Sequence, residues 1–319
     1  MTAYILKRLI QTIPVLLIAS AAVFMMLRLA PGDPAQFIAG PDATPESLVA
    51  VRRDMGLDQP WPVQYVYWLT HAVRGDFGIS FTTRYPVWDL IRQGLPATLE
   101  LAAAALILST LLGAALGIAS ALQEGRPLDL AIGIYNALAL GVPNFWLGLI
   151  LIIVFALLLR WLPPSGHMDL VQAPGQSLRY LILPTVTLSV YLSAVLARFM
   201  RASLLDVLHE DYVRTARAKG LPERAVILGH AVRNALIPVV TVLGLQFGRL
   251  LGGAVIVEAV FAWPGIGSLV VTAVSARDYT VVQGVTMLLV TAFVFINLLT
   301  DVLYGVLDPA VRLGQRGAN

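Results

Sequence analysis

The sequence contains no cysteine, and only 13% of its 319 residues are charged. The absence of cysteine excludes a disulfide framework and a thiolate metal site. Soluble domains carry about 25% charged residues, so this composition excludes an ordinary soluble enzyme and a disordered chain. The net charge of +3 is too small to indicate binding to nucleic acid. Hydrophobic residues make up 58% of the chain, which indicates a polytopic membrane protein.

Six stretches are apolar enough, over the roughly 20 residues that are needed, to cross the hydrocarbon core of a membrane. They are 10–29, 97–122, 130–159, 181–199, 235–257 and 281–303. Lys7 and Arg8 precede the first stretch, but its length and the lack of a small-residue cleavage site favour an uncleaved span over a signal peptide. Pro143 and Pro184 predict kinks in the third and fourth spans. The expected fold is all-α and integral to the membrane, with six transmembrane helices.

The distribution of Lys and Arg predicts the orientation of these helices. An even number of spans places both termini on one side. If that side is the cytoplasm, the internal segments hold 12 of the basic residues in about 64 positions, and the external segments hold 8 in about 110. The positive-inside rule therefore favours cytoplasmic termini. The long loop 200–234 is then internal, and the loop 31–96 is external.

The external loop 31–96 is predicted to fold into a cap between the first two spans. Thr44, Pro45 and Glu46 are typical of an N-cap, a first helical position and an acidic first turn, and Gly56 is placed to end that helix. A second helix is expected to present one apolar face, formed by Tyr65, Trp68, Leu69 and Ala72. The charged residues of this loop are interpreted as mainly solvated, with contacts to a partner as the alternative.

The internal loop carries the clearest local pattern. Residues 211–219 favour a helix with basic residues in its last turn, Gly220 suits the left-handed position after it, and Pro222 suits the first position of another helix. This predicts a helix, a tight turn and a helix on the cytoplasmic face. Ala216 and Ala218 are small enough for the backbone of a partner to approach. The alternative is a solvated basic loop that only satisfies the positive-inside rule.

The fifth predicted span contains glycines at intervals of four residues. Such a stripe lets helices approach closely, either within this chain or against a partner around a translocation path. Gln246 and Arg249 lie in the same span and are costly to place in lipid, so both are expected to face protein or water. Arg249 could attract a carboxylate of the cargo or pair with an acidic group of another chain. The stripe consists of Gly244, Gly248 and Gly252.

The internal loop resembles the cytoplasmic "EAA" loop of bacterial ABC importer permeases. Arg214-Thr215-Ala216 stands in the place of the Glu-Ala-Ala triplet, and Gly220 matches its glycine. The glutamate is absent, and Val232-Arg233 replaces the usual Leu-Pro. The dipeptide/oligopeptide permeases share these departures. Their loop resembles this one from Asp211 to Leu221, and their second motif is matched by His230, Arg233, Asn234 and Pro238.

Further fragments of the same subfamily follow in order along the chain, so that the similarity extends over nearly all of it. They are Ala-Pro-Gly-Asp-Pro at 30–34, Gly-Leu-Asp-Gln-Pro at 56–60, Gly-Asp-Phe-Gly at 75–78, Pro143 with Phe145, Leu-Pro at 183–184, Gly-Gly-Ala at 252–254, Glu258, Phe-Ala-Trp-Pro-Gly-Ile-Gly at 261–267 and Leu-Asp-Pro at 307–309. The chain is similar to the "B"-type permease of a peptide importer.

The resemblance implies the ABC type I importer permease fold in the bacterial inner membrane, and it implies partners. These are a second related permease, two ABC ATPase subunits and an extracytoplasmic substrate-binding protein that delivers a peptide. No phosphate-binding G-x-x-x-x-G-K-[ST] motif occurs here, so ATP and Mg belong to the partner subunits. No metal, cofactor or catalytic residue is expected in this chain, which is not itself an enzyme.

The resemblance also implies roles for two sets of residues. Phe261, Trp263 and Pro264 are expected to lie beneath the docked binding protein. The residues expected to couple the permease to an ATPase are Asp211, Tyr212, Arg214, Thr215, Ala216, Arg217, Ala218, Lys219 and Gly220. The chain then divides into 1–30 (N-terminus and first span), 31–96 (external cap), 97–306 (permease core, with the coupling loop 200–234) and 307–319 (cytoplasmic tail).

Three rival functions remain at this point. The same machine could import glutathione or nickel, although the four histidines lie in predicted loops and mark no metal path. An intramembrane enzyme would need a catalytic dyad or metal ligands within the spans, and no His-Glu-x-x-His motif occurs. An autonomous channel or secondary transporter would be supported by inverted repeats, and the sequence has none that we detect.

Overall fold

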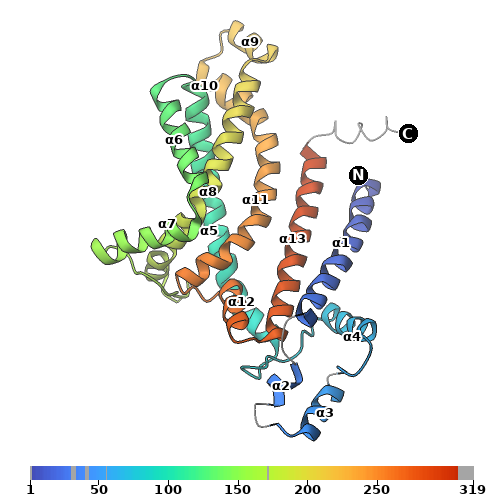
Figure 1. Cartoon of the computed structure of the whole chain (residues 1–319). Helices are drawn as coiled ribbons and strands as arrows, with labels where there is room; N and C mark the ends of the chain where they lie inside the picture. Colours follow the sequence, from blue (N-terminus) through green and yellow to red (C-terminus); the bar gives the residue numbers. More distant parts are fainter. Residues whose placement is uncertain (1, 30–33, 40–42, 55, 171, 308–319) are drawn as a thin grey trace.

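The chain forms a bundle of long helices with shorter helices gathered at its two ends (Figure 1). The computed structural model describes residues 2–29, 34–39, 43–54, 56–170 and 172–307. The elements are α1 (Thr2–Leu29), α2 (Pro34–Ala39), α3 (Pro45–Asp54), α4 (Trp61–Val73), α5 (Val87–Leu122), α6 (Pro127–Gly141), α7 (Asn144–Leu151), the π-helix η1 (Ile152–Leu158), α8 (Pro174–Leu208), α9 (Asp211–Ala218), α10 (Glu223–Ala225), the π-helix η2 (Val226–Ala231), α11 (Val232–Val260), α12 (Ile266–Ser275) and α13 (Tyr279–Leu307). The predicted all-α class is confirmed.

Five of these helices are long and apolar enough to cross a membrane, and a sixth span is counted if a sharply bent helix pair is taken as one. Five of the six predicted stretches fall within single helices, namely α1, α5, α8, α11 and α13. The predicted tail 307–319 lies outside the described residues from position 308 onward.

The third predicted span, 130–159, is not one helix. It divides into α6 and the α7–η1 segment, which are bent by 105° at a short break. Pro143 causes the break, because it has no N–H to donate and its ring disfavours helical backbone at Val142, which is extended with ψ 124°. We expected a kink here, and the actual turn is much sharper. With 15 residues, α6 is about 22 Å long, which is shorter than the hydrocarbon core.

The close contact of α5 with α8 forms the centre of the bundle. Gly113 and Gly117 lie one turn apart on α5, and both face α8. A Cβ atom on Gly113 would lie 2.6 Å from the Cβ of Leu196, and one on Gly117 would lie 2.6 Å from the Cβ of Met200. Only glycine therefore allows the two helices to approach this closely. Close packing of small residues is common between membrane helices, because no hydrophobic effect drives helices together in lipid.

A second region of the core joins α5 and α8 to α11 near the opposite end. Leu101 of α5 and Leu192 of α8 pack against Leu250 and Val257 of α11, and Trp263 closes the cluster. All five residues are almost completely buried. The long helices are thus held together by a continuous apolar interior.

The short helices α2, α3, α4 and α12 lie at one end of the bundle, and α9 and α10 lie at the other (Figure 1). The cap helix starting after Thr44 is confirmed: the Ser47 N–H donates to Thr44 Oγ1 over 3.3 Å, and the left-handed Gly56 follows the helix with φ +62°.

The predicted face of α4 is also confirmed. Tyr65 packs edge-on against Phe24 of α1 at 5.5 Å between ring centroids, and its hydroxyl lies 2.8 Å from Ser20 Oγ.

The α5–α8 contact generates a stability prediction. Gly113→Ala places a methyl group within 2.9 Å of the Ser193 carbonyl oxygen and 2.6 Å of Leu196 Cβ, so the helices must move apart. We expect a loss of about 1–3 kcal/mol, measured as a lower midpoint in thermal unfolding of the purified chain. Gly141→Ala is the matched control, because a Cβ there meets nothing within 4 Å. An equal midpoint for both variants would contradict this account of the packing.

Candidate functional site

The helix α9 is a short amphipathic element that stands at one end of the bundle (Figure 1). Its apolar face is held by Val213 and Ala216, which are buried against Val226 of η2 and against Val207 and Leu208 at the end of α8. This small core attaches α9 to the end of α8 and to η2, which leads into the next long helix.

A tight turn follows α9 as the sequence predicts. The Lys219 N–H donates to the Thr215 carbonyl over 3.0 Å, and the Gly220 N–H donates to that of Arg217 over 2.9 Å. Gly220 is left-handed with φ +77°, and a Cβ there would meet nothing within 4 Å. The glycine is therefore required by its backbone conformation and not by crowding. Pro222 lies one position earlier than predicted, at the N-cap of α10 rather than at its first position.

Polar contacts brace α9 against its neighbours. Arg217 donates to Glu223 at the start of α10 over 2.8 Å. The carboxylate of Glu223 raises the pKa of the Arg217 guanidinium above its ordinary value, so this side chain stays charged at physiological pH. On the other side, Asn234 Nδ2 donates to the hydroxyl of Tyr212 over 2.8 Å and connects α9 to α11. These contacts make α9 a rigid extension of the bundle.

The outward face of α9 is polar and fully available. The ion pair of Arg214 with Asp211, at 3.5 Å, contributes little to stability, because the two side chains are 82% and 95% exposed. Ala216 is buried within the chain, so the expectation that a partner backbone approaches it directly is wrong, whereas Ala218 is exposed. The exposed residues of the segment are Asp211, Tyr212, Arg214, Thr215, Arg217, Ala218, Lys219 and Gly220.

The glycine stripe of α11 faces two different surroundings. A Cβ on Gly244 would overlap Thr300 of α13, and one on Gly248 would lie 2.9 Å from the ring of Phe293. These two glycines therefore serve packing of α11 against α13 within this chain. A Cβ on Gly252 would meet nothing within 4 Å, so this end of the stripe is open.

Two polar residues of α11 have unsatisfied groups. Gln246 is 3% exposed, and its Nε2 has no hydrogen-bond partner among the described residues. Arg249 is exposed, and within the described part of the chain it makes no hydrogen bond or ion pair. The buried amide and the free guanidinium lie on one helix, about one turn apart.

The segment 261–267 is largely internal. Phe261 and Trp263 are 1% and 0% exposed, and the indole Nε1 of Trp263 donates to the Ala97 carbonyl over 2.8 Å. These two rings fill the core between α5 and α11, so they offer no surface of their own to a partner, and their place beneath a docked binding protein stays a prediction. Pro264 and Ala262 are exposed, and Ala262 adopts a left-handed conformation with φ 48°.

Glu258 organises this segment, although the sequence indicated only that it belongs to the shared pattern. Its buried carboxylate accepts hydrogen bonds from Thr98 Oγ1 over 2.7 Å and from the Ser268 N–H over 3.0 Å. The Thr98 hydroxyl in turn accepts from the Ile266 N–H over 2.8 Å. A Cβ on Gly265 would overlap the carboxylate. The glutamate thus ties the ends of α11, α5 and α12 together, a role that the sequence does not reveal because it depends on residues 160 positions apart.

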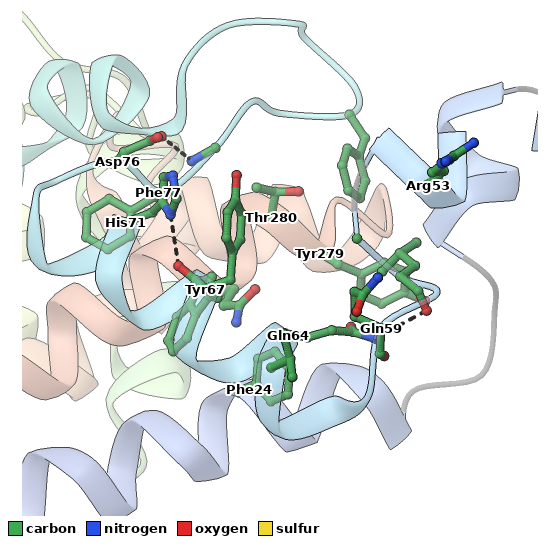
Figure 2. A pocket seen from close by; sticks show the side chains of 17 residues that line it. Phe24, Arg53, Gln59, Gln64, Tyr67, His71, Asp76, Phe77, Tyr279 and Thr280 are labelled. Carbon is green, nitrogen blue, oxygen red and sulfur yellow. Dashed lines mark hydrogen bonds between the residues drawn. The ribbon is translucent and has the colours of Figure 1, made fainter. Parts of the chain in front are cut away.

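A cavity of about 590 Å³ opens between the cap helices and the start of α13 (Figure 2). Arg53 reaches it from α3, and Asp76 reaches it from the connection that follows α4. Both residues are exposed, in agreement with the interpretation that they are mainly solvated, and they also line this cavity. Gln64 also lines it; its Nε2 donates to the Gln59 carbonyl over 2.6 Å, and its Oε1 has no partner among the described residues. Both polar and aromatic side chains line the cavity.

No group of three or more His, Asp or Glu side chains in the described segments is arranged to hold a metal ion. His167 Nε2 lies 3.0 Å from the carboxylate of Glu100, and the two residues form a pair and not a group of three. The candidate sites are therefore surfaces and polar pockets.

Two models of protein families match this chain. Residues 113–313 match the family described as "Binding-protein-dependent transport system inner membrane component", and residues 1–102 match the N-terminal region described for the same membrane components. Together the two matches cover most of the chain.

Individual relatives are similar over their full length. The "Probable peptide ABC transporter permease protein y4tP" of Sinorhizobium fredii is 45% identical over 98% of this chain and 100% of that protein. The "Glutathione transport system permease protein GsiC" is 46% identical in Salmonella choleraesuis and 45% identical in Escherichia coli K12, in each case over 98% of this chain and 99% of that protein. A crystal structure of an amino acid ABC transporter with histidines has a TM-score of 0.47 and 20% identity over 67% of this chain and 89% of that chain.

The Glu258 cluster generates a second prediction. In Glu258→Gln the amide either turns its NH2 toward the Ser268 N–H, or it turns toward Thr98 and leaves the hydroxyl proton without an acceptor. One buried donor is left unpaired in both cases, which costs about 1–3 kcal/mol. We expect a lower midpoint in thermal unfolding, whereas Glu46→Gln, at an exposed position of α3, changes the midpoint little. Equal effects of the two substitutions would show that the Glu258 contacts do not hold this end together.

Proposed function

The chain belongs to the family of binding-protein-dependent transport system inner membrane components, and we propose that it forms half of the translocation path of an ATP-driven importer of di- or oligopeptides. It is a multi-pass permease subunit of an ABC importer in the inner membrane. The family consists of membrane permeases and not of enzymes. The observation that carries the proposal is the rigid, outward-facing helix α9 with its left-handed glycine, at the position where importers of this kind require a coupling element.

We infer a topology of six spans in the ABC type I importer fold, with the bent α6–η1 pair as the third and both termini in the cytoplasm. The distribution of basic residues supports this orientation. The segments are then 1–30 for the N-terminus and first span, 31–96 for the external cap and 97–306 for the permease core. The tail 307–319 is cytoplasmic, and so is the loop 200–234 that contains α9.

The helix α9 is proposed to dock on an ATPase subunit. A docking element transmits movement only if it is rigidly attached, and α9 is attached through the buried Val213 and Ala216 and through the Tyr212–Asn234 hydrogen bond. Its exposed side chains, including Arg214 and Lys219, remain free for the ATPase. Closure of the ATPase dimer would then move α8 and α11 together.

The complete machine is proposed to contain a second related permease, two ATPases that supply ATP and Mg, and an extracytoplasmic substrate-binding protein. On the external side the exposed residues Ala262 and Pro264, together with the cap, offer the surface for the binding protein. Phe261 and Trp263 support this surface from below. The broad cavity beneath the cap helices belongs to the same face.

The translocation path is proposed to run along the open part of α11. Gly252 has free space beside it, and the guanidinium of Arg249 is exposed without an acidic partner in the described chain. The Gln246 amide lies a turn away with an unpaired donor. The exposed cation could attract the carboxylate of a peptide, or it could contact the second permease. Both roles place this face of α11 at the centre of the assembled machine.

The cargo is proposed to be a short peptide. Glutathione is the second candidate, since it is itself a small peptide and since permeases at 45–46% identity carry that name. The binding protein selects the cargo in such systems, so the permease is expected to accept both classes of backbone. Nickel is a weaker candidate, because the described residues form no cluster of metal ligands.

Transport by the reconstituted complex tests this function. The complex, purified from its own membrane through a tag on this chain and placed in vesicles, should take up labelled dialanine only with its binding protein outside and ATP at the ATPase side. Glutathione added in excess reports on the second candidate by competition. Uptake that is driven by an ion gradient and needs no ATP would instead identify an autonomous secondary transporter.

The coupling role generates a third prediction. Gly220→Val forces a β-branched residue into the left-handed region at a cost of about 1–2 kcal/mol, which displaces α9 from its docked position. We expect ATP-dependent uptake to be lost while the protein still inserts in the membrane at the normal level. Gly229→Ala is the control, because this glycine lies in the adjacent η2 with free space for a Cβ. Normal uptake by Gly220→Val at normal expression would refute the coupling role.

A further inference from the structure

A second cavity, of about 720 Å³, lies between α5, α6 and α8. It is formed near the junction of α5 and α6, toward the end of the bundle that carries α9 and α10 (Figure 1). None of the roles described above uses it. Three arginines line it: Arg126 at the start of α6, and Arg198 and Arg201 on one face of α8. A cavity between helices with three guanidinium groups is suited to an anion unless the charges are neutralised within the chain.

One arginine is neutralised within the chain. Arg201 binds Asp129 through two parallel hydrogen bonds of 2.8 Å, from Nε and from a terminal nitrogen. Asp129 is also held by Ser120 and by the Gly125 N–H, so its acceptor capacity is used by protein groups. This ion pair joins α6 to α8 and forms a fixed wall of the cavity.

The other two arginines leave the cavity with excess positive charge. Among the residues that the structure describes, the guanidinium of Arg126 donates only to the neutral side-chain amide of Gln123, over 3.0 Å. Arg198 is exposed and has no hydrogen bond or ion pair with any described residue. Glu124 is the acidic group near Arg201 besides Asp129, and it lies outside the residues that line the cavity. The cavity therefore favours an anion.

A buried amide lies beside the cavity but is not available to a ligand. Asn136 of α6 lines the same cavity and is only 6% exposed. Its Oδ1 has no hydrogen-bond partner among the described residues, and it has almost no accessible surface. The charge of Arg126 and Arg198 alone therefore argues for an anion.

The position of the cavity identifies the ligand. The apolar stretch of α8 ends near Phe199, so Arg198 and Arg201 lie at the level where hydrocarbon gives way to headgroups. Leu130 and Leu140 also line the cavity, and a Cβ on Gly133 would meet nothing within 4 Å. An apolar wall therefore continues from the basic residues along α6. Basic pockets between membrane helices on the cytoplasmic side are suited to anionic lipid headgroups.

We propose that this pocket binds the headgroup of an anionic phospholipid of the cytoplasmic leaflet. Arg126 and Arg198 contact the phosphate, and phosphatidylglycerol is the representative anionic lipid. One acyl chain follows Leu130 and Leu140. The choice of leaflet rests on the topology under the proposed function, whereas the binding itself rests only on the residues of the pocket.

Native mass spectrometry of the intact complex tests this site. The complex is purified in detergent through a tag on this chain and mixed with equal amounts of phosphatidylglycerol and phosphatidylcholine. The wild type should retain phosphatidylglycerol selectively. Each arginine is expected to contribute about fivefold to its affinity, so Arg126→Gln with Arg198→Gln should weaken retention by about 25-fold. Arg92→Gln, an exposed arginine at the start of α5 on the other side, is the charge-matched control.

A further measurement makes the assignment specific. Inorganic phosphate at millimolar concentration should not displace the lipid, because it lacks the acyl chain that lies on α6. Displacement by phosphate would show a site for free anions, and equal retention by the wild type and the double arginine variant would overturn the proposal.

The result is independent of transport. Lipid retention is read without ATP, binding protein or peptide, so a failure of the uptake experiments leaves this test unchanged. If the wild-type complex retains no phosphatidylglycerol because a partner subunit covers α6 and α8, the lipid assignment is also wrong.

Discussion

The whole structure depends on the close approach of α5 and α8 over Gly113 and Gly117. Lipid offers no hydrophobic effect to drive helices together, so packing between small residues has to replace it. With α5 and α8 in contact, α6 is held to α8 by the Asp129–Arg201 pair, and α11 packs against both at the other end. The helix α9 follows the end of α8 and packs against it. Under the proposed function, a movement applied to α9 would be transmitted along the central helix of the bundle.

Buried polar groups determine the shape of the end of the bundle that carries α12. Glu258 is enclosed by apolar residues, but it accepts hydrogen bonds from α5 and from the start of α12, and glycines allow this close contact. Trp263 is fixed nearby through the Ala97 carbonyl. Membrane proteins retain such costly groups where a unique arrangement is needed. Under the proposed function, this end supports Ala262 and Pro264 as a surface for a soluble partner.

Several features could be predicted because they depend only on neighbouring residues. The cap helix after Thr44, the apolar face of α4 around Tyr65 and the left-handed Gly220 all follow from local backbone and side-chain preferences. The errors share a different origin. The sequence did not show that Phe261 and Trp263 are core residues, and it wrongly left Ala216 open to a partner, because burial depends on segments that are distant in the chain. The break at Pro143 was predicted in position but not in size, since its angle depends on what the following helix packs against.

The sequence by itself determined the class of the protein. Apolar runs of sufficient length fix the spans, the few charges predict their orientation, and the ordered motifs place the chain in its family. Only the tertiary structure decided how those charges and polar groups are used. It neutralised Arg201 with Asp129 but left Arg126 and Arg198 facing a cavity, and it separated two packed glycines of α11 from the open Gly252. The reason is that a partner in space, and not the residue itself, decides whether a charge or a glycine in a membrane helix serves packing or binding.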